Sequence, residues 1–305
     1  MLTRRELLAA GAGTGVCLGL GVSPAAQAVT GQLILKQIPS TGEFLPVIGM
    51  GTNRWVADGD EDTMIALGST LTTFSNLGGR VIDTAPVYRS SETALGTLIA
   101  ELDIRNAFFL ATKVDRKDSV DGVMRMEESR KNLQTDQIDL MQVHNLHGAE
   151  TQIRNMLIWK SVERIRYIGI TTSRTDQFAE MESLMERFPL DFVQLNYSVI
   201  GREAEQRLLP LAAEKKIGVM VNVPFHRGRL FKAVKDTALP KWSADFDCTS
   251  WAQFFLKFVV SHPAVTCTIP GMTKAEHAED NMGAAYGRLP NAEQRTRMAA
   301  LFKTA

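Results

Sequence analysis

The stretch Arg80–Gly96 reads RVIDTAPVYRSSETALG and combines a strand, a loop and the start of a helix. Val81–Thr84 is a short apolar run, which is typical of a strand covered on both faces. Ser91–Glu101 repeats apolar residues three or four positions apart, as one buried face of a helix requires. A strand followed directly by a helix is the repeating unit of a parallel α/β fold.

The same strand signal recurs along the chain, with helical patterns such as Phe178–Phe188 between the strands. The expected strands are Val47–Gly51, Val81–Thr84, Phe108–Lys113, Leu140–His144, Tyr167–Thr172, Phe192–Asn196, Gly218–Asn222 and Thr266–Pro270. Strands alternating with helices over roughly 250 residues predict a (β/α)8 barrel, or TIM barrel, as a single domain over residues 29–305. A doubly wound sheet is the weaker alternative, because no GxGxxG motif follows an expected strand.

Three further segments complete the expected fold. Leu33–Ile38, with a turn at Ser40-Thr-Gly42, predicts a hairpin that closes the bottom of the barrel. Pro224–Cys248 is a long irregular stretch after the seventh strand, so we expect a flap over the active face. Asn291–Phe302 predicts a terminal helix.

The first 28 residues have the pattern of an export signal. Arg4 and Arg5 precede an uncharged run to Val22, and Ala26-Gln-Ala28 supplies a cleavage site. The paired arginines resemble a twin-arginine signal, which predicts contact with that export machinery and a periplasmic or exported protein. Contact with a membrane is then expected only transiently, through the signal. A cytoplasmic enzyme whose first residues are not a working signal is the alternative.

Charge and cysteine content exclude several classes of function. Lys+Arg and Asp+Glu both number 34, so nothing indicates binding to nucleic acid. The cysteines Cys17, Cys248 and Cys267 form no CxxC motif and no cluster with histidine, so we expect no metal site. Whether Cys248 and Cys267 pair as a disulfide stays open at this point, because sequence does not test the geometry.

Residues suited to proton transfer fall at or just after consecutive strand ends: Asp83, Tyr88, Lys113 and His144. Strand C-termini meet at one rim of a barrel, so these side chains are expected to share a pocket. An ammonium about 4 Å from a phenolate stabilises it by roughly 4 kcal/mol at an effective dielectric of about 20. We therefore expect Tyr88 to protonate a carbonyl oxygen with the help of Lys113. Asp83 would hold Lys113, and His144 would orient the substrate.

Each of these residues also has an ordinary structural explanation. A carboxylate after a strand often caps a helix, as Asp83 could. Tyr88 could simply pack, Lys113 could be a solvated charge, and His144 could be a core histidine with satisfied hydrogen bonds. The prediction depends on the four types occurring together at strand ends.

The motifs around these residues resemble the aldo-keto reductase family. The similar segments are Ile48-Gly-Met-Gly-Thr52, Asp83-Thr-Ala-Pro-Val-Tyr88 with Ser91-Glu92 and Gly96, Ala111-Thr-Lys113, Asp139-Leu-Met-Gln-Val-His144, Ile165–Ile170, Gln194-Leu-Asn-Tyr197 and Ile269-Pro-Gly271. They extend from about Val47 to Asn281. The resemblance implies a nicotinamide-dependent reductase of aldehydes or ketones, with Asp83, Tyr88, Lys113 and His144 as its catalytic tetrad.

The resemblance also implies a cofactor site, with NADPH expected first and NADH as the alternative. The corresponding positions are Gly51, Thr52, Asp83, Thr171, Thr172, Gln194, Asn222, Pro224, Gly271, Lys274, His277, Asp280 and Asn281. Three positions depart from the family pattern. Thr172 replaces an amide, and Asn222 stands where an aromatic ring stacks on the nicotinamide. His277 replaces the arginine that grips the adenosine phosphate.

For the substrate, a small carbonyl compound, the expected pocket walls are Trp55, Tyr88, His144 and Asn145. Arg89 follows the tyrosine and is expected to face solvent. The departures in the cofactor site and the export signal leave a second hypothesis, an exported barrel that binds cofactor with little or no turnover. Barrel loops set specificity, so the identity of the substrate does not follow from the sequence.

Overall fold

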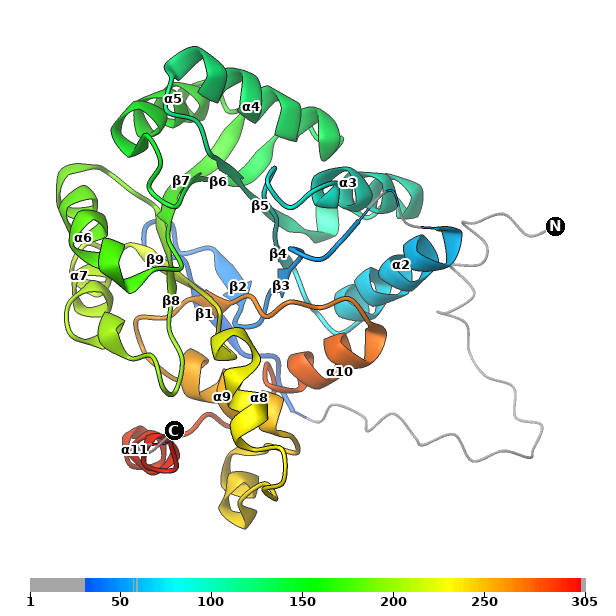
Figure 1. The fold of residues 1–305 in the computed structure, drawn as a ribbon, viewed down its shortest axis with the longest axis vertical. Coiled ribbons are helices and arrows are strands. Elements are labelled where there is room, and N and C mark those ends of the chain that lie inside the picture. Colours follow the sequence, from blue (N-terminus) through cyan, green and yellow to red (C-terminus); the bar gives the residue numbers. More distant parts are fainter. Residues whose placement is uncertain (1–30, 57, 59, 303–305) are drawn as a thin grey trace.

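The computed structural model describes residues 31–56, 58 and 60–302, and it confirms the predicted barrel. One parallel sheet has the order β3 (Met50–Gly51), β4 (Val81–Asp83), β5 (Phe109–Val114), β6 (Ile138–His144), β7 (Ile165–Thr171), β8 (Phe192–Asn196), β9 (Gly218–Asn222) and β10 (Cys267–Thr268). Sequential strands are neighbours throughout, with helices outside the ring (Figure 1). This order rules out the doubly wound alternative.

Backbone contacts between the first and last strands close the ring. Gly49 N–H donates to the Thr268 carbonyl at 2.8 Å, and Gly51 N–H donates to the Pro270 carbonyl at 2.9 Å. The approach is close because Gly51 has no side chain: a Cβ there would lie 2.9 Å from the Ile269 carbonyl oxygen.

Helices cover the outside of the barrel. Their bounds are α2 (Glu61–Asn76), α3 (Ser91–Leu102), α4 (Ser119–Asn132), α5 (Ala149–Ser161), α6 (Phe178–Arg187), α7 (Leu208–Glu214), α8 (Arg229–Ala233), α9 (Trp251–Val260), α10 (Ala275–Gly283) and α11 (Ala292–Ala300). Short 3-10 helices are η2 (Arg105–Ala107), η3 (Thr175–Gln177), η4 (Glu203–Glu205), η5 (His226–Gly228) and η6 (Lys241–Phe246). The predicted terminal helix is α11, which begins at Asn291 with a capping box.

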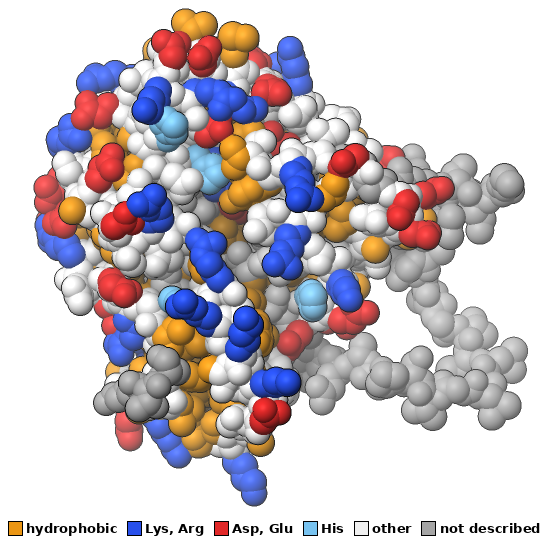
Figure 2. All heavy atoms as spheres, viewed as in Figure 1, with side chains coloured by type: hydrophobic (Ala, Val, Ile, Leu, Met, Phe, Trp, Pro, Cys, Tyr) orange, Lys and Arg blue, Asp and Glu red, His pale blue; other side chains and the backbone are white. Residues whose placement is uncertain are grey.

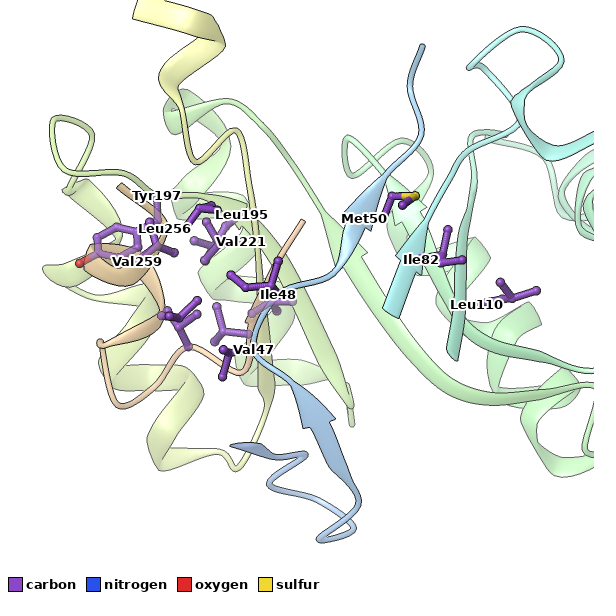
Figure 3. Close-up of a cluster of buried hydrophobic side chains, with 14 of the residues drawn as sticks. Val47, Ile48, Met50, Ile82, Leu110, Leu195, Tyr197, Val221, Leu256 and Val259 are labelled. Atoms are coloured by element: carbon purple, nitrogen blue, oxygen red, sulfur yellow. The ribbon is translucent and has the colours of Figure 1, made fainter. Parts of the chain in front are cut away.

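Alternation along each strand divides the core into two layers. Outward residues pack against the helices; for example, Leu195 and Val221 lie near Leu256 and Val259 of α9 (Figure 3). Inward residues of the lower barrel form a separate apolar cluster that includes Val81, Phe109, Leu140, Phe192 and Met220. The lower interior of the barrel is therefore packed rather than open.

The predicted hairpin closes the bottom of the barrel. β1 (Leu35–Gln37) pairs antiparallel with β2 (Phe44–Pro46). Ile38 and Leu45, both fully buried, join the interior cluster. The hairpin therefore covers this end of the barrel interior.

The segment Pro224–Cys248 is more ordered than a free flap. Of this segment, Pro224, Phe225, Arg227 and Gly228 line the cavity at the strand ends, whereas Leu230 and Phe246 are fully buried. Cys248 and Cys267 are both buried and both free thiols, so the structure does not contain the disulfide.

The expected export signal, Met1–Ala28, lies outside the described residues. Within the part of the chain that the structure describes, no helix is long and apolar enough to span a membrane.

Candidate active site

A cavity of about 640 Å³ opens at the C-terminal ends of the strands. Most residues predicted for the site line it: Gly51, Thr52, Asp83, Tyr88, His144, Asn145, Thr171, Gln194, Asn222, Pro224, Gly271 and His277. All but His277, which lies in α10, come from the upper parts of β3, β4, β6, β7, β8 and β9 or the loops that follow these strands and β10, because all strands of a barrel end at one rim. Lys113 lies directly beneath this surface and is 1% exposed.

The floor of the cavity holds a buried ion pair. Lys113 Nζ lies 2.6 Å from Asp83 Oδ2 and also donates to the Thr84 carbonyl at 2.7 Å. Burial favours the neutral amine, but the charges and hydrogen bonds of Asp83 and Tyr88 outweigh it and raise the pKa of Lys113 above its usual value. The ammonium is therefore charged at neutral pH.

The second oxygen of Asp83 is also occupied. Gln194 Nε2 donates to Asp83 Oδ1 at 2.8 Å, and Gln142 Nε2 donates to it at 3.2 Å. Thr171 fixes the amide of Gln194 by donating to its Oε1 at 2.9 Å. With both oxygens engaged, Asp83 is suited to holding the lysine rather than to accepting a proton.

Tyr88 lies above this ion pair in the turn after β4. The turn is closed by Tyr88 N–H donating to the Ala85 carbonyl and by Ser91 N–H donating to the Tyr88 carbonyl, both at 3.0 Å. Lys113 Nζ lies 5.1 Å from the centre of the tyrosine ring. The ring meets His144 edge to face, with centroids 6.0 Å apart and planes at 87°. The structure thus brings all four predicted catalytic residues together.

His144 is neutral at physiological pH. Burial, followed by the positive charge of Lys113, lowers the pKa of His144 to about 4. A neutral imidazole can donate one hydrogen bond but is not an acid at pH 7.

Asn222 is oriented by its amide nitrogen, which donates to the Thr172 carbonyl at 3.0 Å. Its Oδ1 is buried without a hydrogen-bond partner, although the residue lines the cavity. A buried acceptor of this kind calls for a donor from a ligand. Thr172 itself is fully buried and donates to Gln177, so its side chain does not reach the cavity.

The residues predicted to bind the cofactor after the last strand fall into two groups, those that line the cavity and those that do not. Gly271 and His277 line it. Lys274 is exposed at the start of α10 and does not. Asp280 accepts a hydrogen bond from Gln253, and Asn281 is 4% exposed. Lys274, Asp280 and Asn281 therefore lie outside the cavity wall.

Comparison with known proteins identifies the fold and its lineage. The family model of the aldo/keto reductases matches residues 47–300. The chain belongs to the aldo/keto reductase family. Aldo-keto reductase YhdN of Bacillus subtilis is 33% identical over 214 residues, which cover 63% of this chain and 62% of that protein. The NADH-specific methylglyoxal reductase of Escherichia coli is 27% identical over 68% of this chain and 72% of its own length.

A solved aldo-keto reductase of Klebsiella pneumoniae, in complex with NADPH, has the same fold. It aligns with a TM-score of 0.75 at 23% identity, over 90% of this chain and 95% of the other. The family resemblance and the fold predicted from sequence are thereby confirmed.

Trp55 is not a pocket wall in this aldo/keto reductase. It is fully buried, and its indole nitrogen donates to the Met272 carbonyl at 2.7 Å. Its neighbours Asn53 and Arg54 line the cavity instead. Arg89 is exposed, in a left-handed conformation with φ of 55°.

Sequence reasoning also missed Gln142 and Arg227. Gln142 lies two residues before His144, so strand alternation puts both on the inner face of β6, and this signal was present in the sequence. Arg227 lines the cavity from η5, where its φ of 54° is irregular, and no sequence pattern indicates that position. In the described part of the chain, no group of histidine, cysteine or acidic residues is suited to hold a metal ion.

Proposed function

We propose that this chain reduces an aldehyde or ketone to an alcohol with NADPH or NADH, and that Tyr88 donates the proton. The observation that carries the proposal is the ammonium of Lys113. It is held by Asp83 at 2.6 Å and lies 5.1 Å from the centre of the Tyr88 ring, closed to solvent. A positive charge in that position stabilises the phenolate that remains after the proton leaves.

The remaining residues set the geometry of this proton transfer. Asp83 keeps Lys113 charged and fixed, and Gln142 and Gln194 keep Asp83 in place. His144, neutral and edge-on to Tyr88, would donate a hydrogen bond to the carbonyl oxygen. Tyr88 and His144 would then hold the oxygen between them, with Tyr88 as the group that donates the proton.

The residues present fit a nicotinamide dinucleotide. The unpaired Oδ1 of Asn222 offers an acceptor to a carboxamide N–H₂. Among the described residues, Arg54 and Arg227 have no ion-pair partner although both line the cavity, and they suit the phosphates. Lys and Arg side chains gather around the middle of the face in Figure 2. A bound coenzyme of this kind would supply the hydride.

Two of the proteins similar to this chain support NADPH and NADH respectively. The Klebsiella structure is in complex with NADPH, while the Escherichia coli relative is described as NADH-specific. We propose NADPH first, with NADH as the alternative.

The test compares cofactor binding with carbonyl-dependent oxidation of NADPH and NADH across a panel of aldehydes and ketones. Tyr88→Phe is expected to lower kcat by about 10²–10⁴-fold and to leave cofactor affinity close to wild type. Tyr286→Phe is the matched control, because the Tyr286 hydroxyl donates to the Leu77 carbonyl at 2.9 Å and does not line the cavity. Wild-type turnover in Tyr88→Phe would refute the acid assignment. Tight cofactor binding with no turnover on any carbonyl would favour the cofactor-binding module.

A further inference from the structure

The active cavity continues beyond the catalytic residues. His144 and Asn145 also line an adjoining hollow of about 720 Å³. Val87, next to Tyr88 in the sequence, forms part of its wall. A substrate with its carbonyl between Tyr88 and His144 therefore has space for its remaining atoms in this hollow.

The hollow is positively charged. Its walls carry Arg116, Lys117, His147 and Arg174 together with a single carboxylate, Asp115. We call this cavity the basic hollow. That carboxylate is already held by two guanidinium groups, Arg116 at 2.9 Å and Arg125 at 3.1 Å. The cationic side chains of Arg116, Lys117 and Arg174 thus line the basic hollow, while the charge of Asp115 is neutralised by its ion pairs.

Two of the cations remain open to a ligand. Lys117 is exposed and has no ion-pair partner among the described residues. Arg174 pairs with Asp176, but both side chains are over 60% exposed, so this pair is screened and easily rearranged.

The loops that present these charges are fixed by specific contacts. Gln152 Nε2 donates to the carbonyls of Arg116 at 2.9 Å and Asp118 at 2.8 Å. Gly148 packs against the same loop, and a Cβ there would lie 2.6 Å from the Arg116 carbonyl oxygen. Gln177 donates to the Asn145 carbonyl at 3.1 Å. A preformed loop loses less entropy when a ligand binds.

We infer that the substrate carries an anionic group, a carboxylate or a phosphate, remote from its carbonyl and bound in the basic hollow. This inference rests on the proposed function and specifies its substrate class. The carbonyl end supplies no competing net charge, because Lys113 is paired with Asp83. Charge selection would therefore act at the far end of the substrate.

The experiment compares substrates that differ only in charge. The substrates are 4-formylbenzoate and 4-formylbenzamide, which are similar in shape, with 4-formylphenyl phosphate distinguishing phosphate from carboxylate. Each is reduced by wild type and by Lys117→Gln/Arg174→Gln. The preference is defined as kcat/KM for 4-formylbenzoate divided by kcat/KM for 4-formylbenzamide. The intrinsic reactivity of each aldehyde cancels when this preference is compared between two proteins. We expect the preference to be about tenfold lower in the double variant and to fall with added salt in wild type.

The control is Lys131→Gln/Lys215→Gln, which removes two exposed lysines that do not line the cavity or the basic hollow. Its preference is expected to match wild type. An unchanged preference in Lys117→Gln/Arg174→Gln would overturn the inference while leaving the proposed function intact. If none of these three aldehydes is reduced, the panel of aldehydes and ketones decides the proposed function, and calorimetric binding of the same pair decides the inference. Tighter binding of the benzoate, lost in the double variant, supports it; equal Kd values overturn it.

Discussion

Asp83 and Lys113 form an ion pair that solvent does not reach, with Nζ 2.6 Å from Oδ2 and side chains 3% and 1% exposed. Burying two charges costs desolvation free energy, so such a pair is weak evidence for stability. Here the remaining hydrogen-bonding groups are satisfied by Thr84, Gln142 and Gln194. The arrangement is consistent with the proposed proton transfer at Tyr88, in which Asp83 holds the Lys113 ammonium near the phenol.

Removing one member of this pair should destabilise the protein strongly. Lys113→Met leaves Asp83 buried without its counter-charge, and we expect the free energy of unfolding to fall by about 3–5 kcal/mol. Lys113→Met/Asp83→Leu removes both charges and should regain most of that loss without regaining activity. Urea denaturation of the three proteins measures the difference. A double variant no more stable than Lys113→Met would contradict the assignment of the loss to an unpaired buried charge.

His144 should give the protein a stability that depends on pH. Its pKa in the folded state is about 4, whereas the unfolded value is about 6.5, so below pH 6.5 the unfolded chain binds a proton that the folded chain does not. The stability is full above pH 6.5 and declines as the pH falls toward 4, by up to about 3 kcal/mol. We expect His144→Gln to flatten this decline in denaturation curves.

His262 provides the comparison for that measurement. Burial, followed by the charge of Arg295, also lowers its pKa to about 4, so His262→Gln should flatten the decline in a similar way. His144→Gln alone should impair carbonyl reduction, because His262 does not line the cavity. Equal activity in the two variants would count against His144 as a substrate contact.

The sequence was sufficient to predict that the four proposed catalytic residues lie together, because most of their positions follow from strand periodicity. Asp83, Lys113 and His144 each lie at the end of an apolar run, and parallel strands of a barrel bring their ends to one rim. The same alternation would have identified Gln142, two residues before His144. Tyr88 lies in the loop just after β4, so its position followed from the end of that strand, and the family motif supported it.

Loop geometry accounts for what the sequence did not predict. Trp55 turns inward because its indole reaches the Met272 carbonyl, a contact between residues 217 positions apart. Arg227 reaches the cavity after Val223 and His226, both with positive φ, and a β-branched residue rarely adopts that conformation. Such contacts depend on the folded tertiary structure rather than on local pattern.

The export signal that the sequence predicts can be tested on the mature protein. In the source cell, we expect cleavage after Ala28, which leaves Val29 as the first residue of a 277-residue chain. Arg4→Lys/Arg5→Lys should block export and leave the full-length chain in the cytoplasm. Sequencing the N-terminus after cell fractionation measures both, with Lys131→Gln as a charge control away from the signal. A full-length wild-type chain in the cytoplasmic fraction would support the cytoplasmic alternative.

The cofactor preference should respond to His277, the residue that lines the cavity in place of the family's arginine. His277→Arg adds a permanent charge and a two-pronged donor, which suit a phosphate and offer no advantage for a hydroxyl. We expect the ratio of affinities for NADPH over NADH to rise by about tenfold, measured by fluorescence titration. His277→Gln, neutral and similar in size, should leave the ratio within about twofold of wild type. If both substitutions change the ratio equally, the positive charge at this position does not set the preference for NADPH over NADH.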